Sequence, residues 1–252
     1  MISYKSKREI ELLKQAGHIV YLTHQFLAPY IKPGIKTMEL EVKAEKFIRE
    51  HGATPSFKGY DGFPYTLCIS VNDEIVHGFP SDRILEEGDI ISIDIGACYK
   101  GYHGDSAWTY PVGKISKENE YLLEHTKKAL YEGIKKAKVG ARIGDISYAI
   151  EQYATKYNLG VVKELVGHGV GTSVHEDPNV PNYGKKGTGP KIKDGMVIAI
   201  EPMLTLGSPE IYILDNDWTV VTEDGSNSAH FEHTIAITNE GVEILTGEWN
   251  NG

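Results

Sequence analysis

Apolar residues recur at helical spacing in two long stretches of the chain, and each stretch is followed by a shorter one. The long patterns cover roughly residues 7–30 and 117–137, and the short ones follow glycine-led turns at Gly34 and Gly140. Apolar positions three to four residues apart are typical of amphipathic helices. Runs of apolar residues, typical of strands, follow each helical pair. The pattern predicts two halves of similar organisation, each with helices packed on antiparallel strands.

The two halves also match at a constant offset of 106 residues. The matched pairs are Gly34 with Gly140, Leu40 with Ile146, Glu45 with Glu151, and Phe47 with Tyr153. In the same way LEEGDIISIDIG, from Leu85, resembles IKDGMVIAIEPM, from Ile192. An internal duplication of this kind predicts pseudo-equivalent halves, roughly 1–112 and 113–252, in a single catalytic domain spanning 1–252. The halves are expected to meet at a shared cleft, and the glycine- and proline-rich stretch 177–195 is expected to be a long loop.

Carboxylates interrupt the predicted strands of the first half. Asp94 lies among the isoleucines of GDIISIDIG, and Asp105 follows a turn that the sequence centres between Tyr99 and Lys100. This centre would place the two aspartates directly opposite each other in a hairpin, with Cβ atoms roughly 5 Å apart. Buried carboxylates that close repel each other unless a proton or a cation lies between them. An exposed hairpin, with both aspartates facing water, is the alternative.

The second half repeats this arrangement twice. Glu201 ends the run MVIAIEP, and Glu232 lies within AHFEHTIAIT. Strand alternation places Val197 and Ala199 on the face of Glu201. The later segment is expected to be one strand, with His230, Glu232 and Thr234 on one face. Four carboxylates are therefore predicted to lie in buried strands.

His168, flanked by glycines in GHGVG, is a further candidate because small neighbours let the backbone pack closely around an imidazole. A histidine with ordinary structural hydrogen bonds is the alternative, since the chain has ten. Four carboxylates would be neutralised by two divalent cations. Carboxylates with one imidazole suit Mn, Fe, Co or Zn, and two such ions form a familiar hydrolytic arrangement. The sequence thus predicts that metal ions compensate these buried charges.

The overall composition restricts the remaining choices. The formal net charge is -9 and no block of lysine and arginine is present, which argues against nucleic acid or an anionic membrane as a partner. The N-terminal residues MISYKSKREIELL contain no apolar signal core, and no apolar run approaches the length of a membrane span. Cys68 and Cys98 are the only cysteines, so we expect no disulfide framework and a cytoplasmic location.

Five blocks of the sequence resemble those of the methionine aminopeptidases and of the wider pita-bread fold. The blocks are SIDIGACYKGYHGD, GHGVG, HEDP, IEPM and FEHT, and the resemblance covers nearly the whole chain. The sequence has no long insertion, and in this respect it resembles the type I, bacterial-sized form of the family. The resemblance implies an α+β fold with antiparallel sheet inside and helices outside. It also implies that two metal ions are bound by Asp94, Asp105, His168, Glu201 and Glu232, with Asp94 bidentate and Asp105 and Glu232 bridging.

The resemblance also implies roles for other residues. His77 is similar to the histidine that contacts the nitrogen of the scissile peptide, and His175 to the one that hydrogen-bonds the carbonyl oxygen. Glu201 is similar to the residue that accepts a proton from the attacking water. The pocket for the first side chain of the substrate is expected to comprise Tyr60, Phe63, Cys68 and Trp218.

Some positions depart from the family pattern. Many relatives have a cysteine at the position of Phe57, a phenylalanine at that of Val174 and a glutamine at that of His230. These three differences affect the expected shape of the pocket. Asn72 and Ser228 match positions that help to hold a monovalent cation in relatives.

The expected function is metal-dependent removal of the N-terminal methionine from nascent proteins and peptides whose second residue is small, by a monomeric enzyme. A second possibility is an Xaa-Pro aminopeptidase or prolidase, although these usually carry an additional N-terminal domain. A non-catalytic peptide-binding module would be expected to have lost metal ligands, whereas all five are present here. A metal-buffering or structural role is the least favoured alternative.

Overall fold

The computed structural model describes residues 1–248 and contains four α-helices that enclose antiparallel strands. The helices are α1 (Lys7–Leu27), α2 (Thr37–Glu50), α3 (Lys117–Ile134) and α4 (Ile143–Lys156), with short 3-10 helices η1 (Ala28–Tyr30) and η2 (Tyr60–Gly62). The strands are β1 (Thr54–Pro55), β2 (Leu67–Val71), β3 (Glu74–Val76), β4 (Ile90–Tyr99), β5 (Tyr102–Pro111), β6 (Gly160–Val161), β7 (Gly167–Gly169), β8 (Glu176–Val180), β9 (Met196–Ile200), β10 (Met203–Thr205), β11 (Ile211–Ile213), β12 (Val220–Thr222), β13 (Ser228–His230), β14 (His233–Thr238) and β15 (Gly241–Ile244).

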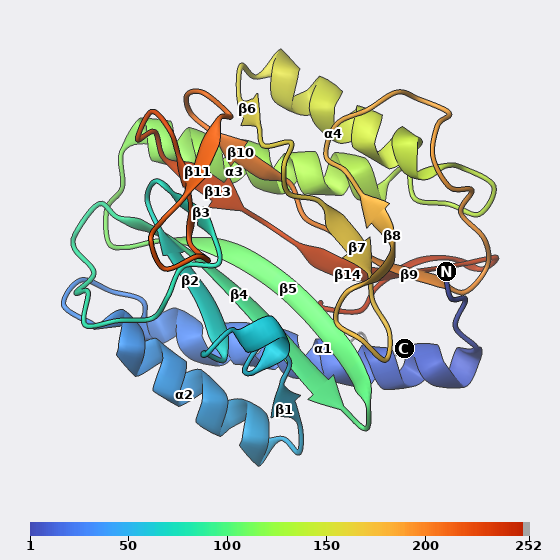
Figure 1. The fold of residues 1–252 in the computed structure, drawn as a ribbon, viewed down its shortest axis with the longest axis horizontal. Helices are drawn as coiled ribbons and strands as arrows, with labels where there is room; N and C mark the ends of the chain where they lie inside the picture. Colours follow the sequence, from blue (N-terminus) through green and yellow to red (C-terminus); the bar gives the residue numbers. More distant parts are fainter. Residues whose placement is uncertain (249–252) are drawn as a thin grey trace.

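The helices cover the strands from two sides. Figure 1 shows α1 and α2 along one side of the molecule, α3 and α4 along the other, and the long β4–β5 hairpin between them. One sheet has the order β1-β4-β2, with β5 paired to β4, and a second has the order β15-β14-β9-β7-β8. Two small sheets, β13-β10-β6 and β11-β12-β3, complete the described part of the chain. The predicted combination of outer helices and inner antiparallel strands is confirmed.

The internal repeat is visible in the element boundaries. Helices α2 and α4 begin and end 106 residues apart, and β4 and β9 begin 106 residues apart. Their caps correspond as well: the Glu39 carboxylate accepts the backbone N–H of Lys36 (3.1 Å), and the Asp145 carboxylate accepts that of Arg142 (2.8 Å). The two local sequences share the same cap and the same apolar spacing, and they therefore fold into equivalent helices.

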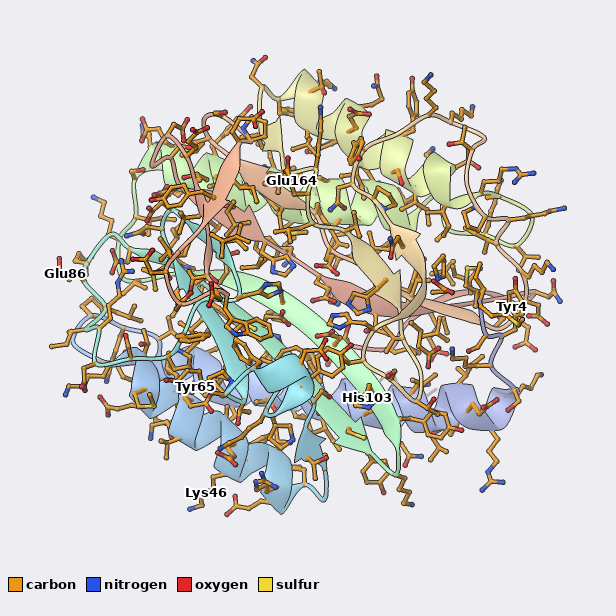
Figure 2. All side chains as sticks on the ribbon, viewed as in Figure 1. Tyr4, Lys46, Tyr65, Glu86, His103 and Glu164 are labelled. Carbon is orange, nitrogen blue, oxygen red and sulfur yellow. The ribbon has the colours of Figure 1, made fainter. Side chains whose placement is uncertain are left out.

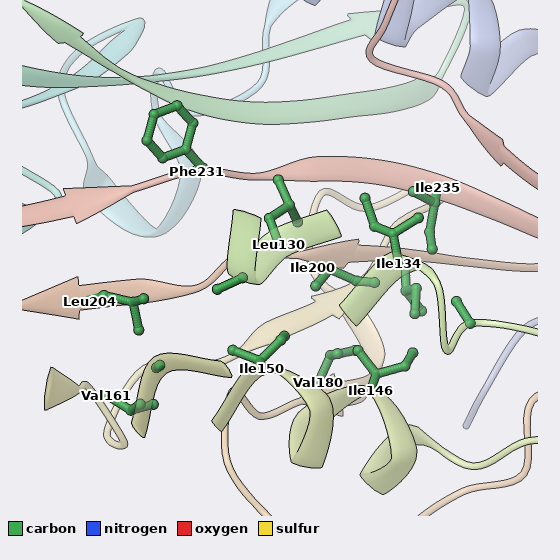
Figure 3. Packing of buried hydrophobic residues seen from close by; sticks show 14 of the residues in the cluster. Leu130, Ile134, Ile146, Ile150, Val161, Val180, Ile200, Leu204, Phe231 and Ile235 are labelled. Carbon is green, nitrogen blue, oxygen red and sulfur yellow. The ribbon is translucent and has the colours of Figure 1, made fainter. Parts of the chain in front are cut away.

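Strand alternation directs the carboxylate of the first half inward. Ile91, Ile93 and Ile95 of β4 pack with the apolar faces of α1 and α2, so Asp94 lies on the opposite face of the strand. On the other side of the molecule, α3 and α4 pack their apolar faces onto the second half's strands. Figure 3 shows Leu130, Ile134, Ile146 and Ile150 from these helices beside residues such as Val180 and Ile200. The polar centre is thus held between two apolar layers.

The hairpin register differs from the prediction by two residues. Asp94 pairs with Ala107, and Asp105 pairs with Gly96. The turn is centred one residue later than expected, because Lys100 and Gly101 both adopt positive φ (49° and 83°) and form a two-residue hairpin loop. The prediction that the aspartates face each other directly was wrong. A shift of two residues keeps both side chains on one face, so they remain diagonal neighbours.

The predicted continuous strand around Glu232 is also wrong, because it is divided into β13 and β14 at Phe231 and Glu232. Here the chain pairs with the hairpin instead: the Glu232 N–H donates to the Ala107 carbonyl (2.8 Å), and the Ser106 hydroxyl donates to the Glu232 carbonyl. Glu201 likewise lies just beyond the end of β9, ahead of Pro202. Both carboxylates therefore occupy strand ends rather than strand interiors.

The stretch 177–195, expected to be a loop, begins with β8, which pairs with β7. This close pairing depends on Gly169, since a Cβ atom there would lie 2.2 Å from the Asp177 carbonyl oxygen. Among the described residues, no helix combines the length and the apolar character that crossing a membrane requires.

Candidate metal centre

The five predicted ligands converge from both halves of the chain. Ligand atoms of Asp94, Asp105 and Glu232 all lie within 4.8 Å of one another, and those of His168, Glu201 and Glu232 form a second such group. The first half supplies the two aspartates through the β4–β5 hairpin. The second half supplies the others from β7 and from the ends of β9 and β13. The predicted cluster is therefore present in the fold.

Buried oxygen atoms in this cluster lack hydrogen bonds. Within the described residues, Asp94 Oδ1, Asp105 Oδ1 and Glu232 Oε1 have no hydrogen-bonding partner. Asp105 and Glu232 are each only 2% exposed. A buried carboxylate without partners costs several kcal/mol, roughly, unless a cation binds it. These atoms fit the requirements of divalent metal ions.

The tautomer of His168 supports the same conclusion. Its Nδ1 lies 2.9 Å from the carbonyl oxygen of Gly169, which can only accept a hydrogen bond, so Nδ1 of the neutral ring carries the proton. The lone pair of Nε2 then points toward Glu201 Oε1 (3.4 Å) and Asp105 Oδ2 (3.6 Å). An imidazole lone pair that faces two carboxyl groups is a suitable set of ligand atoms for a divalent cation.

Burial and mutual repulsion raise the pKa values of these carboxyl groups. Burial raises the pKa of Glu201 to about 8. Burial, with a contribution from Glu201, raises the pKa of Asp94 to about 7. The pKa values of Asp105 and Glu232 are raised by burial and by the neighbouring carboxylates. Bound cations would offset this repulsion, and oxygen donors with one imidazole suit Mn, Fe, Co or Zn.

His77 and His175 line the cavity beside the carboxylates. Burial lowers the pKa of both rings, that of His77 to about 4, so both are neutral near pH 7. His77 adopts φ 58°, and the next residue must be glycine because a Cβ atom on Gly78 would lie 2.1 Å from the Ile69 carbonyl oxygen. The His175 ring contacts that of His168, with centroids 4.2 Å apart. Geometry also groups His175 with Asp105 and His168 as possible ligands, so its role as a non-ligand stays a prediction.

The cavity has a volume of about 650 Å³ and combines the polar cluster with an aromatic pocket. All four predicted pocket residues line it, and so does Phe57. The rings of Phe63 and Trp218 meet edge to face at 5.1 Å. Phe57, Phe63, Cys68 and Val174 form one buried apolar cluster, so Phe57 lies in the pocket wall and Val174 packs with the residues of that wall.

Two aromatic residues that pack against this apolar cluster were missed by the sequence analysis. Tyr65 and Phe79 pack against Phe63, with centroids 6.2 and 5.5 Å away. Both lie in the segments YDGFPY and VHGFP, so the clustering of aromatic residues around predicted site residues was the available signal.

His230 is buried in the cavity wall, with Nε2 3.5 Å from Glu201 Oε2. Burial lowers its pKa to about 4. Asn72 and Ser228 also come together: the Ser228 N–H donates to the Asn72 carbonyl (2.9 Å), and Asn72 adopts φ 60°. A monovalent cation at this position stays a prediction.

A partly buried ion pair, also missed, anchors the loop that carries His175. Lys5 Nζ lies 2.6 Å from Glu176 Oε2, and the Lys5 side chain is only 4% exposed. The other Glu176 oxygen accepts the backbone N–H of Ser173 (3.2 Å). The pair therefore ties the loop at 172–176 to the N-terminal segment. No periodic pattern or motif around Lys5 indicates this contact.

We expect Lys5→Met to destabilise the protein by about 3 kcal/mol, because the Glu176 carboxylate would stay partly buried without its cation. The displaced loop should also lower kcat. Denaturant unfolding and steady-state kinetics measure the two effects. The double variant Lys5→Met/Glu176→Gln should unfold at a higher denaturant concentration than Lys5→Met alone. Equal stability of the two variants would contradict this account of the pair.

Comparison with known proteins is consistent with this geometry. A family model described as metallopeptidase family M24 matches residues 11–239. The chain is 56% identical over 246 residues to methionine aminopeptidase 1 of Bacillus subtilis, covering 98% of this chain and 99% of that one. It is 51% identical over 247 residues to methionine aminopeptidase of Clostridium acetobutylicum, with 98% and 99% covered. The chain therefore belongs to metallopeptidase family M24.

Solved structures narrow the assignment. The crystal structure of methionine aminopeptidase from Thermotoga maritima has a TM-score of 0.97 and 43% identity, covering 98% of this chain and all of that one. Prolidase from Pyrococcus furiosus has a TM-score of 0.78 and 26% identity, and the match covers only 66% of its chain. The predicted resemblance to type I, bacterial methionine aminopeptidases and the predicted pita-bread fold are confirmed.

Proposed function

We propose that this chain is a metal-dependent methionine aminopeptidase, which hydrolyses the first peptide bond of proteins and peptides that begin with methionine. The observation that carries the proposal is the convergence of four carboxylates, of which Asp105 and Glu232 are buried, and the Nε2 lone pair of His168 on one cavity that also contains an aromatic pocket. Asp94, Asp105, His168, Glu201 and Glu232 would hold two divalent ions. When bound, such ions lower the pKa of water and polarise a peptide carbonyl group.

The side chains of the cavity supply the remaining steps. Glu201, one of the cavity carboxylates, would accept a proton from the attacking water. The neutral ring of His175 can donate a hydrogen bond to the carbonyl oxygen as negative charge develops there. The neutral ring of His77 lies near Trp218 (centroids 6.3 Å apart) and can contact the peptide nitrogen between the pocket and the cavity mouth. Glu201 therefore acts on the water, and the two histidines act at different atoms of the peptide group.

The pocket accounts for selectivity at the first residue. Its wall is aromatic and apolar, with the Cys68 thiol kept protonated because burial raises its pKa. An unbranched apolar side chain such as that of methionine can enter it, whereas a charged side chain would be buried without a partner. The loop carrying His77 limits the space available to the second residue. We therefore expect selection for small second residues.

A panel of Met-X-Ser peptides tests this function. We expect high kcat/KM for X = Ala or Gly and much lower values for X = Leu or Lys, because bulk at the second position would meet the loop holding His77. In the variant Phe57→Cys, which widens the pocket wall, slow substrates should be cleaved faster. Equal kcat/KM values for X = Ala and X = Lys would contradict the steric argument.

The prolidase-like alternative is not favoured, since the prolidase match is weaker and covers only part of that chain. A preference for X = Pro alone in the same panel would favour the prolidase-like alternative.

We also propose that residues 1–252 form one catalytic domain of two pseudo-equivalent halves, because both halves supply site residues. The protein is proposed to act as a cytoplasmic monomer.

A further inference from the structure

Two basic segments that are distant in sequence lie side by side at the end of α3 and the start of α4. Residues 135–142 (KKAKVGAR) and 185–191 (KKGTGPK) contain seven of the chain's 26 lysines and arginines and no acidic residue. The Gly140 N–H donates to the Ile192 carbonyl (3.0 Å), and the Ile143 N–H donates to the Pro190 carbonyl (3.0 Å). Backbone hydrogen bonds therefore hold the two segments in fixed register. We call the surface that residues 135–141 form together with Lys186 and the adjoining face of α4 the basic groove.

The basic groove is a concave surface of about 720 Å³ on the outside of α4. Its lining includes five exposed lysines: Lys135, Lys136, Lys138, Lys156 and Lys186. Its two acidic residues already have partners. Glu132 pairs with Lys135 (2.6 Å), and Asp145 accepts the backbone N–H groups of Arg142 (2.8 Å) and Gly187 (2.9 Å). The lining therefore has five lysines against two carboxylates, and this excess of positive charge on a chain of net charge -9 favours a polyanionic partner.

We propose that the basic groove binds single-stranded RNA. Lysines on both walls can neutralise successive phosphates, and Tyr148, 39% exposed in the groove, offers a face on which an unpaired base can stack. The Gln152 amide and the Tyr148 hydroxyl, both in the lining, suit the 2′-hydroxyl groups that distinguish RNA from DNA. A membrane surface fits less well, because a concave, lysine-lined groove presents no apolar helix face for insertion.

This proposal departs from the expectation drawn from the sequence. That expectation rested on the absence of a continuous block of lysine and arginine, whereas folding joins two short segments about 50 residues apart. The basic groove is distinct from the metal cavity, whose lining shares none of its residues.

Fluorescence anisotropy with a labelled oligouridine RNA of 15 nucleotides tests the proposal. If four phosphates are neutralised, raising KCl from 50 to 200 mM should weaken binding roughly 50-fold. The variant Lys136→Glu/Lys186→Glu should bind about tenfold more weakly at 50 mM KCl and show a smaller salt dependence. Tyr148→Ala should also bind roughly tenfold more weakly, with the salt dependence unchanged.

The matched control is Lys32→Glu/Lys46→Glu, which changes the net charge equally at exposed positions away from the groove. Lys46 projects from α2, on the opposite side of the molecule from α4 (Figure 2). Equal loss of RNA binding in both double variants would overturn the proposal. So would tighter binding to DNA of the same length or to phosphatidylserine vesicles. Methionine release from Met-Ala-Ser should be unchanged in both variants, so failure of RNA binding leaves the proposed function intact.

Discussion

Replacing Asp105 with asparagine is expected to abolish nearly all methionine release while leaving the metal-free protein at least as stable as the parent. Asp105 is 2% exposed and lies within 4.8 Å of ligand atoms of Asp94 and Glu232. The amide keeps the shape of the carboxylate but removes one negative charge from the site. Metal affinity should therefore fall, and activity should fall with it.

The same substitution is expected to leave the metal-free protein equally stable or more stable, although it lowers activity. Burial and the neighbouring carboxylates raise the pKa of Asp105 in the folded protein. The folded state therefore holds a proton that the unfolded chain releases at lower pH, so the metal-free protein loses stability as pH rises through this range. Asparagine removes that dependence. The thermal midpoint of Asp105→Asn should equal or exceed that of the parent, and the difference should grow as the pH rises.

Elemental analysis measures the metal content of the variant. Melting curves in chelator measure the stability of the metal-free protein, and kcat/KM on Met-Ala-Ser measures its activity after metal is added. The control is Asp215→Asn, which removes one exposed carboxylate and should change none of them. An Asp105→Asn protein with full metal content and parental activity would show that Asp105 is not a ligand.

Removing His77 or His175 is expected to lower kcat by about 10²–10⁴ while bound metal is retained. Both rings are neutral in the cavity and can donate hydrogen bonds to the peptide, because burial lowers their pKa values. Neither loss changes the charge of the carboxylate cluster. The expected signature is thus a slow enzyme that still contains its metal.

The variants His77→Ala and His175→Ala are compared with His51→Ala, which removes an exposed histidine at the end of α2. Elemental analysis separates the two roles. If His175→Ala loses metal in proportion to activity, the grouping of His175 with Asp105 and His168 reflects ligation, and the set of five ligands is incomplete.

Periodicity and duplication were sufficient to predict much of the fold. The four helices begin close to the expected residues because their apolar spacing and glycine-led turns are local properties. Local patterns were insufficient where pairing between distant segments decides the structure. The division between β13 and β14 depends on hydrogen bonds from Glu232 to the β4–β5 hairpin, which no single segment encodes.

The candidate site was predicted more completely than the details that support it. Carboxylates in apolar surroundings are conspicuous in a sequence, since their burial must be compensated. The register of the hairpin depended on two residues with positive φ at Lys100 and Gly101, and an error of one residue at the turn centre moved the pairing by two. The partly buried Lys5–Glu176 pair joins positions 171 residues apart and has no local signal.

The most direct test of the account is release of free methionine from Met-Ala-Ser by protein that has been stripped with a chelator and then reloaded. The stripped protein should be folded but inactive, and Mn, Co or Fe(II) should restore activity as roughly two ions bind per chain. Full turnover by the stripped protein, with its metal content verified as zero, would contradict the account.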